Sequence, residues 1–201
     1  MTTARDLTFT AMDVSPSRPV EQGDLSLALA GAELIDLLTG EAVTLDDDLI
    51  VPGMRVATAD RLLGQADEAL VRERPYESVE DWLWRRGRGL ASAYVAAFEK
   101  EGQLARQRHR WLPFREGRTE LADSPDRHAA ADRWASREPV LVALAAAVGI
   151  GEKTTGDTSG VENADVETVL ATVDDALLEL EAVRQRRAIE KAAFDNVWRG
   201  E

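Results

Sequence analysis

The sequence predicts a mainly α-helical protein: a single globular domain of amphipathic helices around a central hydrophobic helix, with one or two small β-hairpins. Residues 24–39 are apolar on almost every helical face, which is typical of a helix at the centre of a domain. Apolar residues also recur at helical spacing from Val166 to Val183. The β-prone runs are few and short, and no internal repeat is present, so we treat 1–201 as one domain.

The N-terminal elements lead into the central helix. A short amphipathic segment over 3–12 is followed by a Ser- and Pro-rich connection over 15–22, which predicts a loop. Asp24 is a suitable start signal for the central helix, and Gly40 is a suitable stop signal. Within that helix Glu33 and Asp36 share a face, and we expect them to hydrogen-bond across the core or to lie at its exposed edge.

Two β-prone pieces over 42–51 flank Asp46–Asp48, a pattern that predicts a hairpin. Three consecutive aspartates invite a metal hypothesis. A calcium loop, however, places its carboxylates at alternating positions with a Gly at the sharp turn. Because that spacing is absent, we expect a solvated turn, no metal site and no cofactor. A helix over 58–74 is expected next.

The following elements are also predicted to be helical. Ser78, with Asp81 three residues later, forms a capping-box pattern at the start of a helix that carries two tryptophans. A second helix is expected over 90–101, and further helices begin at Pro125 and Pro139, because proline is well placed in a first helical turn.

The C-terminal region contains one predicted loop. Residues 151–164 are polar and rich in turn-forming residues, which predicts a mobile surface loop. From Val166 to the end we expect one or two amphipathic helices, with Arg184, Arg186 and Arg187 on or near a break.

Charge is distributed unevenly along the chain. The protein has a net charge of −13, yet residues 85–118 hold nine Arg or Lys and three Glu, a local net of +6. In an extended segment Arg106, Arg108 and Arg110 would project from the same side over about 13 Å. Three guanidinium groups along one edge suit the oxygens of phosphate groups, so this basic segment predicts a surface for an anion.

An apolar run lies inside the basic segment and indicates which class of anionic ligand the segment binds. Trp111, Leu112 and Phe114 stand between Arg110 and Arg115. Amphipathic aromatics favour the boundary between membrane and water, where Arg reaches the headgroups. The alternative is that the apolar residues anchor a hairpin to the core, while the arginines form a solvated face.

Composition excludes several classes of protein. The chain has no Cys, which excludes disulfides, thiolate catalysis and cysteine-ligated zinc. The first residues lack the apolar stretch of a secretory signal, and the longest apolar run, near 139–150, is short of the ~20 residues that span a bilayer. We therefore expect a cytoplasmic protein whose membrane contact is peripheral. With only His109 and His128, no glycine-rich phosphate loop and no nucleophile beside a base, no catalytic residue is predicted.

The order of several segments resembles a known family, the Golgi phosphoprotein 3-like proteins, which have eukaryotic and many bacterial members. The composition looks bacterial. The segments that carry the resemblance are GDLSLALAGAELIDLLTGEAVTL (23–45), DEAL (67–70), SVEDWL (78–83) and FEKEGQL (98–104), the last followed by WLPF. No one segment is diagnostic, but their order and spacing together are fairly specific and cover most of the chain.

The resemblance implies a peripheral membrane protein that binds phosphatidylinositol 4-phosphate in a pocket of Trp and Arg residues. It also implies a projecting β-hairpin that supports oligomerisation and dips apolar residues into the bilayer, and residues 111–114 fall at that hairpin. The family's pocket positions fall near Glu21, Ala30, Arg88 and Ala91, of which Arg88 alone keeps the family's residue type. A small shift of the alignment would recruit Arg85 or Arg86.

The favoured function is therefore a non-catalytic lipid-binding module, with an anionic headgroup of the phosphatidylinositol 4-phosphate type as its partner. The predicted headgroup-binding residues are Arg85, Arg86, Arg88, Arg106, Arg108 and Arg110, and the predicted hairpin tip is Trp111, Leu112, Phe114 and Arg115. The alternative is an assembly scaffold that self-associates through its basic hairpin into a homo-oligomer. Nucleic acid is a less favoured partner, because the acidic total charge repels it.

Overall fold

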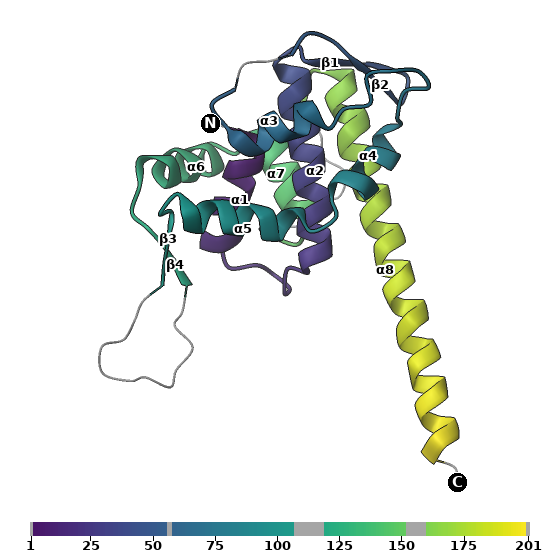
Figure 1. Cartoon of the computed structure of the whole chain (residues 1–201). Coiled ribbons are helices and arrows are strands. Elements are labelled where there is room, and N and C mark those ends of the chain that lie inside the picture. The colour runs from purple at the N-terminus through teal and green to yellow at the C-terminus, as the bar shows by residue number, and fades with distance from the viewer. Residues whose placement is uncertain (1, 56–57, 107–118, 152–159, 200–201) are drawn as a thin grey trace.

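The computed structural model describes residues 2–55, 58–106, 119–151 and 160–199 (Figure 1). These ranges contain eight α-helices and two two-stranded antiparallel hairpins, which confirms the mainly α fold class. The elements, in order, are α1 (Thr3–Asp13), α2 (Gln22–Thr39), β1 (Val43–Asp46), β2 (Leu49–Pro52), α3 (Arg61–Glu68), α4 (Val79–Arg86), α5 (Leu90–Lys100), β3 (Leu104–Arg106), β4 (Thr119–Leu121), α6 (Pro125–Ala135), α7 (Pro139–Ala147) and α8 (Ala164–Arg199).

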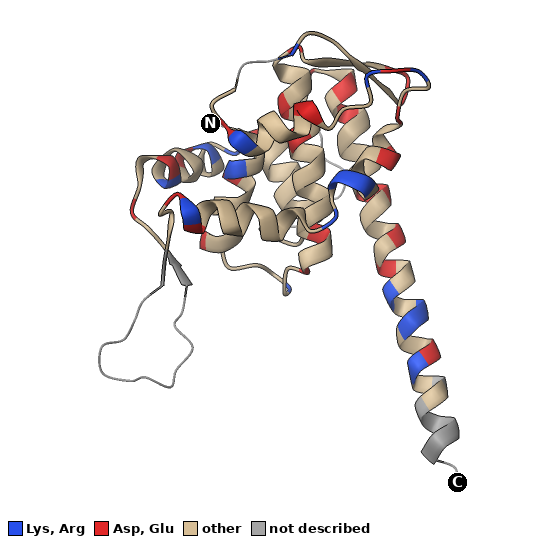
Figure 2. Ribbon diagram, viewed as in Figure 1, with Lys and Arg blue, Asp and Glu red and all other residues tan. Residues whose placement is uncertain are grey.

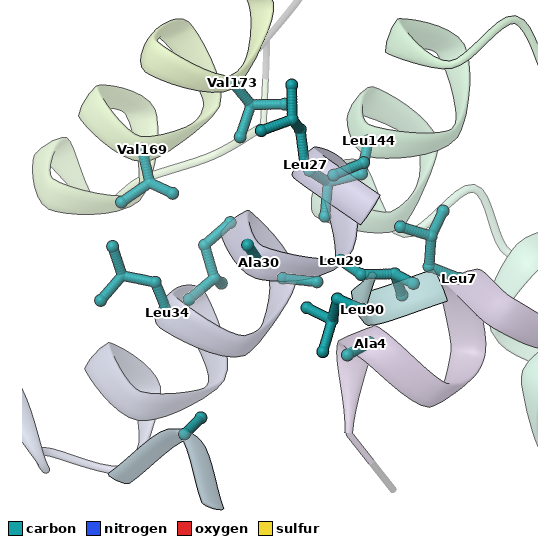
Figure 3. Close-up of a cluster of buried hydrophobic side chains, with 14 of the residues drawn as sticks. Ala4, Leu7, Leu27, Leu29, Ala30, Leu34, Leu90, Leu144, Val169 and Val173 are labelled. Carbon is teal, nitrogen blue, oxygen red and sulfur yellow. The ribbon is translucent and has the colours of Figure 1, made fainter. Parts of the chain in front are cut away.

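Helix α2 lies at the centre of the domain, as predicted. It passes through the body with α1, α5, α4, α7 and α8 around it (Figure 1), and buried Leu and Ala side chains line it on several sides (Figure 3). The helix begins two residues before Asp24 and ends at Gly40, whose backbone N–H donates to the carbonyl oxygen of Asp36. A helix that buries nearly every face forms because its partners cover it from all sides.

Gly31 lets α2 and α8 approach closely. A Cβ atom built at this position would lie 2.5 Å from Cγ2 of Val173 on α8, a distance that no side chain tolerates. Val169 and Val173 from α8 lie against α2 beside this glycine (Figure 3). The missing side chain therefore fixes the distance between the central helix and α8.

The first hairpin agrees with its prediction. β1 and β2 pair antiparallel, with Asp46 opposite Leu49, and Asp47 in the turn has a positive φ of 56°. Asp residues adopt this left-handed conformation more readily than most. Asp46, Asp47 and Asp48 are all exposed, which confirms a solvated turn.

Two element boundaries differ from the prediction. Helix α3 spans Arg61–Glu68 and not 58–74. Its start is set by Asp60, whose carboxylate accepts from the N–H groups of Leu62 and Leu63. The predicted break near Arg184 is wrong, since α8 is one continuous helix from 164 to 199. That range contains no Gly or Pro, and Arg is a good helix former, so clustered charge alone does not interrupt the helix. The predicted 151–164 loop falls mostly outside the described residues.

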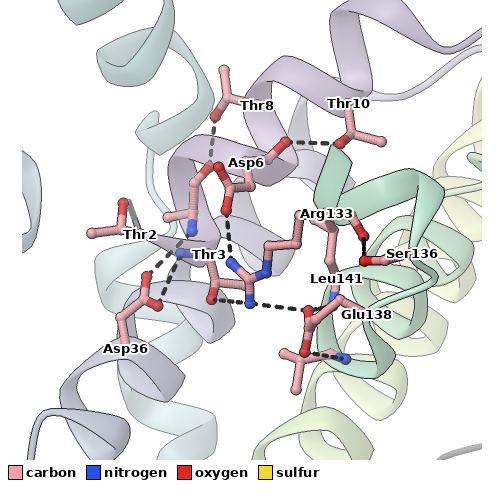
Figure 4. A network of polar contacts seen from close by, with 12 residues as sticks. Thr2, Thr3, Asp6, Thr8, Thr10, Asp36, Arg133, Ser136, Glu138 and Leu141 are labelled. Atoms are coloured by element: carbon pink, nitrogen blue, oxygen red, sulfur yellow. Dashed lines mark hydrogen bonds and ion pairs between the residues drawn. The ribbon is translucent and has the colours of Figure 1, made fainter. Parts of the chain in front are cut away.

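Asp36 joins α1 to α2 through the free backbone groups at the start of α1. Its two carboxylate oxygens accept from the N–H groups of Thr3 (2.9 Å) and Ala4 (3.3 Å), as Figure 4 shows. Next to it, Arg133 of α6 pairs with the buried Asp6 (2.7 Å) and with Glu138 (2.9 Å). Burial raises the pKa of Asp36 to about 6, although the two N–H donors act in the opposite direction. The position across the core predicted for this carboxylate is confirmed.

Asp36 should make stability depend on pH. Because its pKa is higher in the folded than in the unfolded protein, its contribution is fully present below pH 3.8 and is lost as pH rises through about 6. Relative to Asp36→Asn, the wild type should lose about 2 kcal/mol of unfolding free energy between about pH 4 and pH 7. Urea unfolding across this range measures the difference. Asp46→Asn, which removes one carboxylate at an exposed position, is the matched control.

Candidate functional site

Helix α4 carries two of the predicted headgroup-binding arginines at its C-terminal end. The hydroxyl of Ser78 accepts from the N–H of Asp81 (3.1 Å) and caps the start of the helix, as the sequence pattern predicts. Arg85 and Arg86 lie in the last turn, where positive charge complements the helix dipole. Arg88 follows in the turn between α4 and α5.

Arg85 is exposed but already paired. Its guanidinium makes two hydrogen bonds to the carboxylate of Glu77, at 2.6 and 2.7 Å, and a third to the carbonyl oxygen of Ala69. The same guanidinium lies over the ring of Trp82, 5.3 Å from its centroid. Arg85 thus holds the segment between α3 and α4 against α4. A headgroup would have to compete with Glu77 for the Arg85 guanidinium.

Arg86 points into the protein and not toward solvent. Its Nε and Nη2 atoms donate to the two carboxylate oxygens of Glu33 on α2, at 2.7 and 2.9 Å. Nη2 also donates to the carbonyl oxygen of Leu62 on α3. The Glu33 side chain is fully buried and that of Arg86 is 15% exposed, so this pair is part of the core.

Tyr94 of α5 completes this buried group. Its hydroxyl donates to Oε1 of Glu33 at 3.0 Å. Burial raises the pKa of Glu33, and the paired Arg86 opposes that rise. Burial and the nearby Glu33 also raise the pKa of Tyr94, which keeps its hydroxyl protonated as a donor. The group therefore joins α2, α3, α4 and α5 through contacts within the protein.

Arg88 differs from its two neighbours because it is exposed and makes no ion pair with the residues described. Gly87, just before it, lies against α2: a Cβ atom there would come within 3.3 Å of the carbonyl oxygen of Ser26. Gly89, just after it, has a φ of 71°, which favours glycine. The two glycines hold Arg88 on a tight turn beside the first turns of the central helix.

The start of α2 also contacts the start of α5. The hydroxyl of Ser26 accepts from the N–H of Ala91 (3.1 Å), and the side chain of Gln22 donates to the hydroxyl of Ser92. The positions that the family resemblance assigns to the pocket near Glu21, Arg88 and Ala91 thus lie on elements that meet here. Ala30 lies one helical turn beyond Ser26, is fully buried, and accepts from the indole of Trp82 through its carbonyl oxygen.

The negative charge at the start of α2 is neutralised internally. Asp24 is buried, and its carboxylate lies 2.6 Å from Nη1 of Arg184 on α8 and 3.7 Å from Nη2 of Arg18. Arg184 also lies close to Gly23, where a Cβ atom would be 3.0 Å from its guanidinium. Two cations thus flank the first turn of α2, on the side where α8 leaves the body.

The basic hairpin lies at the other end of α5. β3 and β4 pair with Arg106 opposite Thr119, so the predicted hairpin begins as expected. Residues 107–118, which include Arg108, Arg110, Trp111, Leu112, Phe114 and Arg115, lie outside the described residues, as does the side chain of Arg106. Helix α5, of 11 residues, separates Arg88 from β3 by about 16 Å along its axis. In the described part, the structure does not bring Arg85, Arg86 and Arg88 together as one free patch.

Sequence reasoning missed a second group of free cations. Arg186, Arg187 and Lys191 are exposed on the projecting half of α8, and they make no ion pair among the residues described (Figure 2). The sequence signal is the cluster of Arg184, Arg186 and Arg187. It was interpreted as a helix break and not as a surface.

Other kinds of site find no support in the described ranges. Within them, no group of three His, Asp or Glu side chains is arranged to hold a metal ion. Every helix there is either too short or too polar to cross a bilayer. Acidic and basic residues are both spread over the helices and loops of the body, and the projecting half of α8 carries several basic residues (Figure 2).

Comparison with known proteins identifies the family of this chain. The family model described as Golgi phosphoprotein 3 (GPP34) matches residues 4–192, nearly the whole chain. A search of curated proteins found no match. The match includes the central helix, the α4–α5 turn and most of α8. The chain belongs to the Golgi phosphoprotein 3 (GPP34) family.

Proposed function

We propose that this protein is a non-catalytic peripheral membrane protein that binds an anionic lipid headgroup of the phosphatidylinositol 4-phosphate type. The observation that carries the proposal is the position of Arg88. It is exposed and unpaired among the described residues, on a turn that packs against the start of α2. Family membership supports the same location, because the resemblance assigns a pocket arginine to this residue.

In this proposal Arg88 has a different role from Arg85 and Arg86. Arg88 contacts the headgroup phosphate. Arg85 and Arg86 hold the turn in place through Glu77 and Glu33 and are positioning residues. Because a basic residue near an anionic surface contributes about 1 kcal/mol, Arg88 alone binds weakly and depends on salt.

The basic hairpin supplies the second attachment in this proposal. Stable anchoring of a peripheral protein generally takes two signals. Arg106, Arg108 and Arg110 would add electrostatic attraction, and the apolar run over 111–114 would enter the interface. Arg88 and the start of the hairpin lie at the two ends of α5, and in this proposal one membrane surface contacts the protein at both places.

Liposome flotation tests the proposal. The wild type should float with vesicles that contain phosphatidylinositol 4-phosphate and not with neutral phosphatidylcholine vesicles. Arg88→Glu should weaken binding about tenfold or more, and the triple change of Arg106, Arg108 and Arg110 to Glu should weaken it further. Arg61→Glu is the matched control, because it changes the net charge equally at an exposed position on α3.

Three outcomes have distinct meanings. Equal binding to vesicles with phosphatidylserine at the same surface charge would restrict the proposal to general anionic-membrane affinity. If Arg61→Glu reduced flotation as much as Arg88→Glu, total charge and not the α4–α5 turn would be responsible. No flotation of the wild type with any anionic vesicle would overturn the proposal.

A further inference from the structure

Helix α8 extends well beyond the body of the domain. Among the described side chains, its last ion pair with α2 joins Arg184 to Asp24, and residues 185–192 are all exposed. From Arg184 to the end of the helix is about 22 Å, and Figure 1 shows this half projecting away from the other helices. An exposed helix of this length gains little stability of its own, so a partner surface is expected for it.

The charges of α8 separate into two halves. Residues 164–183 include six Asp or Glu and no Lys or Arg, whereas 184–199 include five Lys or Arg and two Asp or Glu. The helix dipole favours this order of signs but acts mainly within the first and last turns. Acidic residues continue to Glu181, at the middle of the helix, so the dipole does not account for the whole pattern.

The outer face of α8 also carries two large apolar side chains. Leu178 is 70% exposed and Ile189 is 69% exposed. They are 11 residues apart, which is about three helical turns, so both lie on the same face. The small side chain of Ala182 is exposed between them. Val169 and Val173 occupy a different face and pack on α2, which leaves the outer face open.

We propose that α8 pairs in antiparallel orientation with α8 of a second copy of this chain, across a two-fold axis near residue 183. Three features of the sequence share this centre. The midpoint of Leu178 and Ile189 falls between 183 and 184, and the charge boundary falls between Glu181 and Arg184. The third is the pair Glu179 and Arg186, both exposed and two turns apart, whose midpoint falls between 182 and 183.

An axis at this point gives a self-complementary interface. Leu178 of each copy packs on the partner's Ile189, and Glu179 pairs with the partner's Arg186. The acidic half of each helix then lies along the basic half of the other, which a parallel arrangement would prevent. Because the pairing uses only α8, it does not depend on the lipid binding proposed above.

A membrane fits the projecting half of α8 less well than a second copy does. A helix that lies in a membrane needs its apolar residues on one side. Here the exposed Ile189 and Phe194 are five residues apart, or about 140° around the helix axis, and Glu190 lies between them. The acidic half of the same helix would also be repelled by an anionic surface.

Disulfide trapping of the full chain tests both the pairing and its direction. The chain has no Cys, so single substitutions give unambiguous products. Ala182→Cys should form a covalent dimer under mild oxidation, because residue 182 meets its copy near the axis. Ala171→Cys, also exposed on α8, should not, because the two sulfurs would lie about 36 Å apart along the helices. Crosslinking of both variants would overturn the antiparallel arrangement.

Charge exchange provides a second test, measured by sedimentation over a wide range of concentrations. Glu179→Arg and Arg186→Glu should each weaken the dimer about tenfold, because like charges then face each other twice. The double variant should recover most of the wild-type affinity. A monomeric wild type at all concentrations, or single variants that dimerise as the wild type does, would overturn the proposal. Circular dichroism should show the same helix content in every variant.

Discussion

Replacement of Arg86 by Met is expected to lower the free energy of unfolding by about 3–5 kcal/mol. The substitution keeps most of the side-chain volume but removes both hydrogen bonds to Glu33, whose carboxylate is fully buried. The hydroxyl of Tyr94 would still donate to that carboxylate. An uncompensated buried charge is costly, so the pKa of Glu33 should rise further. Urea unfolding at neutral pH measures the loss.

Two further variants separate this effect from a general loss of charge. Arg85→Met removes the neighbouring arginine, whose side chain is 43% exposed and whose pair with Glu77 should contribute only about 1 kcal/mol. The double variant Arg86→Met with Glu33→Leu removes both buried charges and should recover much of the lost stability. If Arg85→Met cost as much as Arg86→Met, the buried pair would not be the reason. The same would follow if the double variant were less stable than Arg86→Met.

The difference between these arginines shows which property of the site the sequence does not predict. Arg85, Arg86 and Arg88 are all predicted as headgroup-binding residues, because they are close in sequence and carry the same charge. Their environments depend on residues elsewhere: the partner of Arg86 is 53 positions away, on another helix. The number and spacing of the charges in the sequence indicate the local electrostatic potential. The ion-pair partner of each charge can be identified only when the packing of the four helices is known.

The sequence predicts the fold better than it predicts the site, because most elements of the fold have local sequence signals. The central helix was predictable because an apolar run on all faces has one stable location. The starts of α4 and α6 were predictable because Ser78 and Ser124 supply local caps, each accepting from an N–H three residues later. The course of α8 was predicted wrongly, because a cluster of arginines was interpreted as a break in a range that contains no Gly or Pro.

Two tryptophans that are neighbours in the sequence should also differ in their effect on stability, because their burial differs. Trp82→Ala is expected to cost about 3–5 kcal/mol, because the ring is fully buried and its removal leaves a large cavity. Its indole N–H also donates to the carbonyl oxygen of Ala30 at 3.1 Å, which ties α4 to the central helix. Trp84→Ala should cost about 1–2 kcal/mol, since that side chain is only partly buried.

Trp82→Phe distinguishes the two contributions at Trp82. It retains most of the apolar volume but loses the hydrogen bond, so its cost should lie well below that of Trp82→Ala. Thermal and urea unfolding of the three variants measure this order. Equal losses for Trp82→Ala and Trp84→Ala would contradict the burial on which the order depends. A loss for Trp82→Phe as large as that for Trp82→Ala would instead show that the bond to Ala30 dominates, and that α4 is held to the central helix mainly by a polar contact.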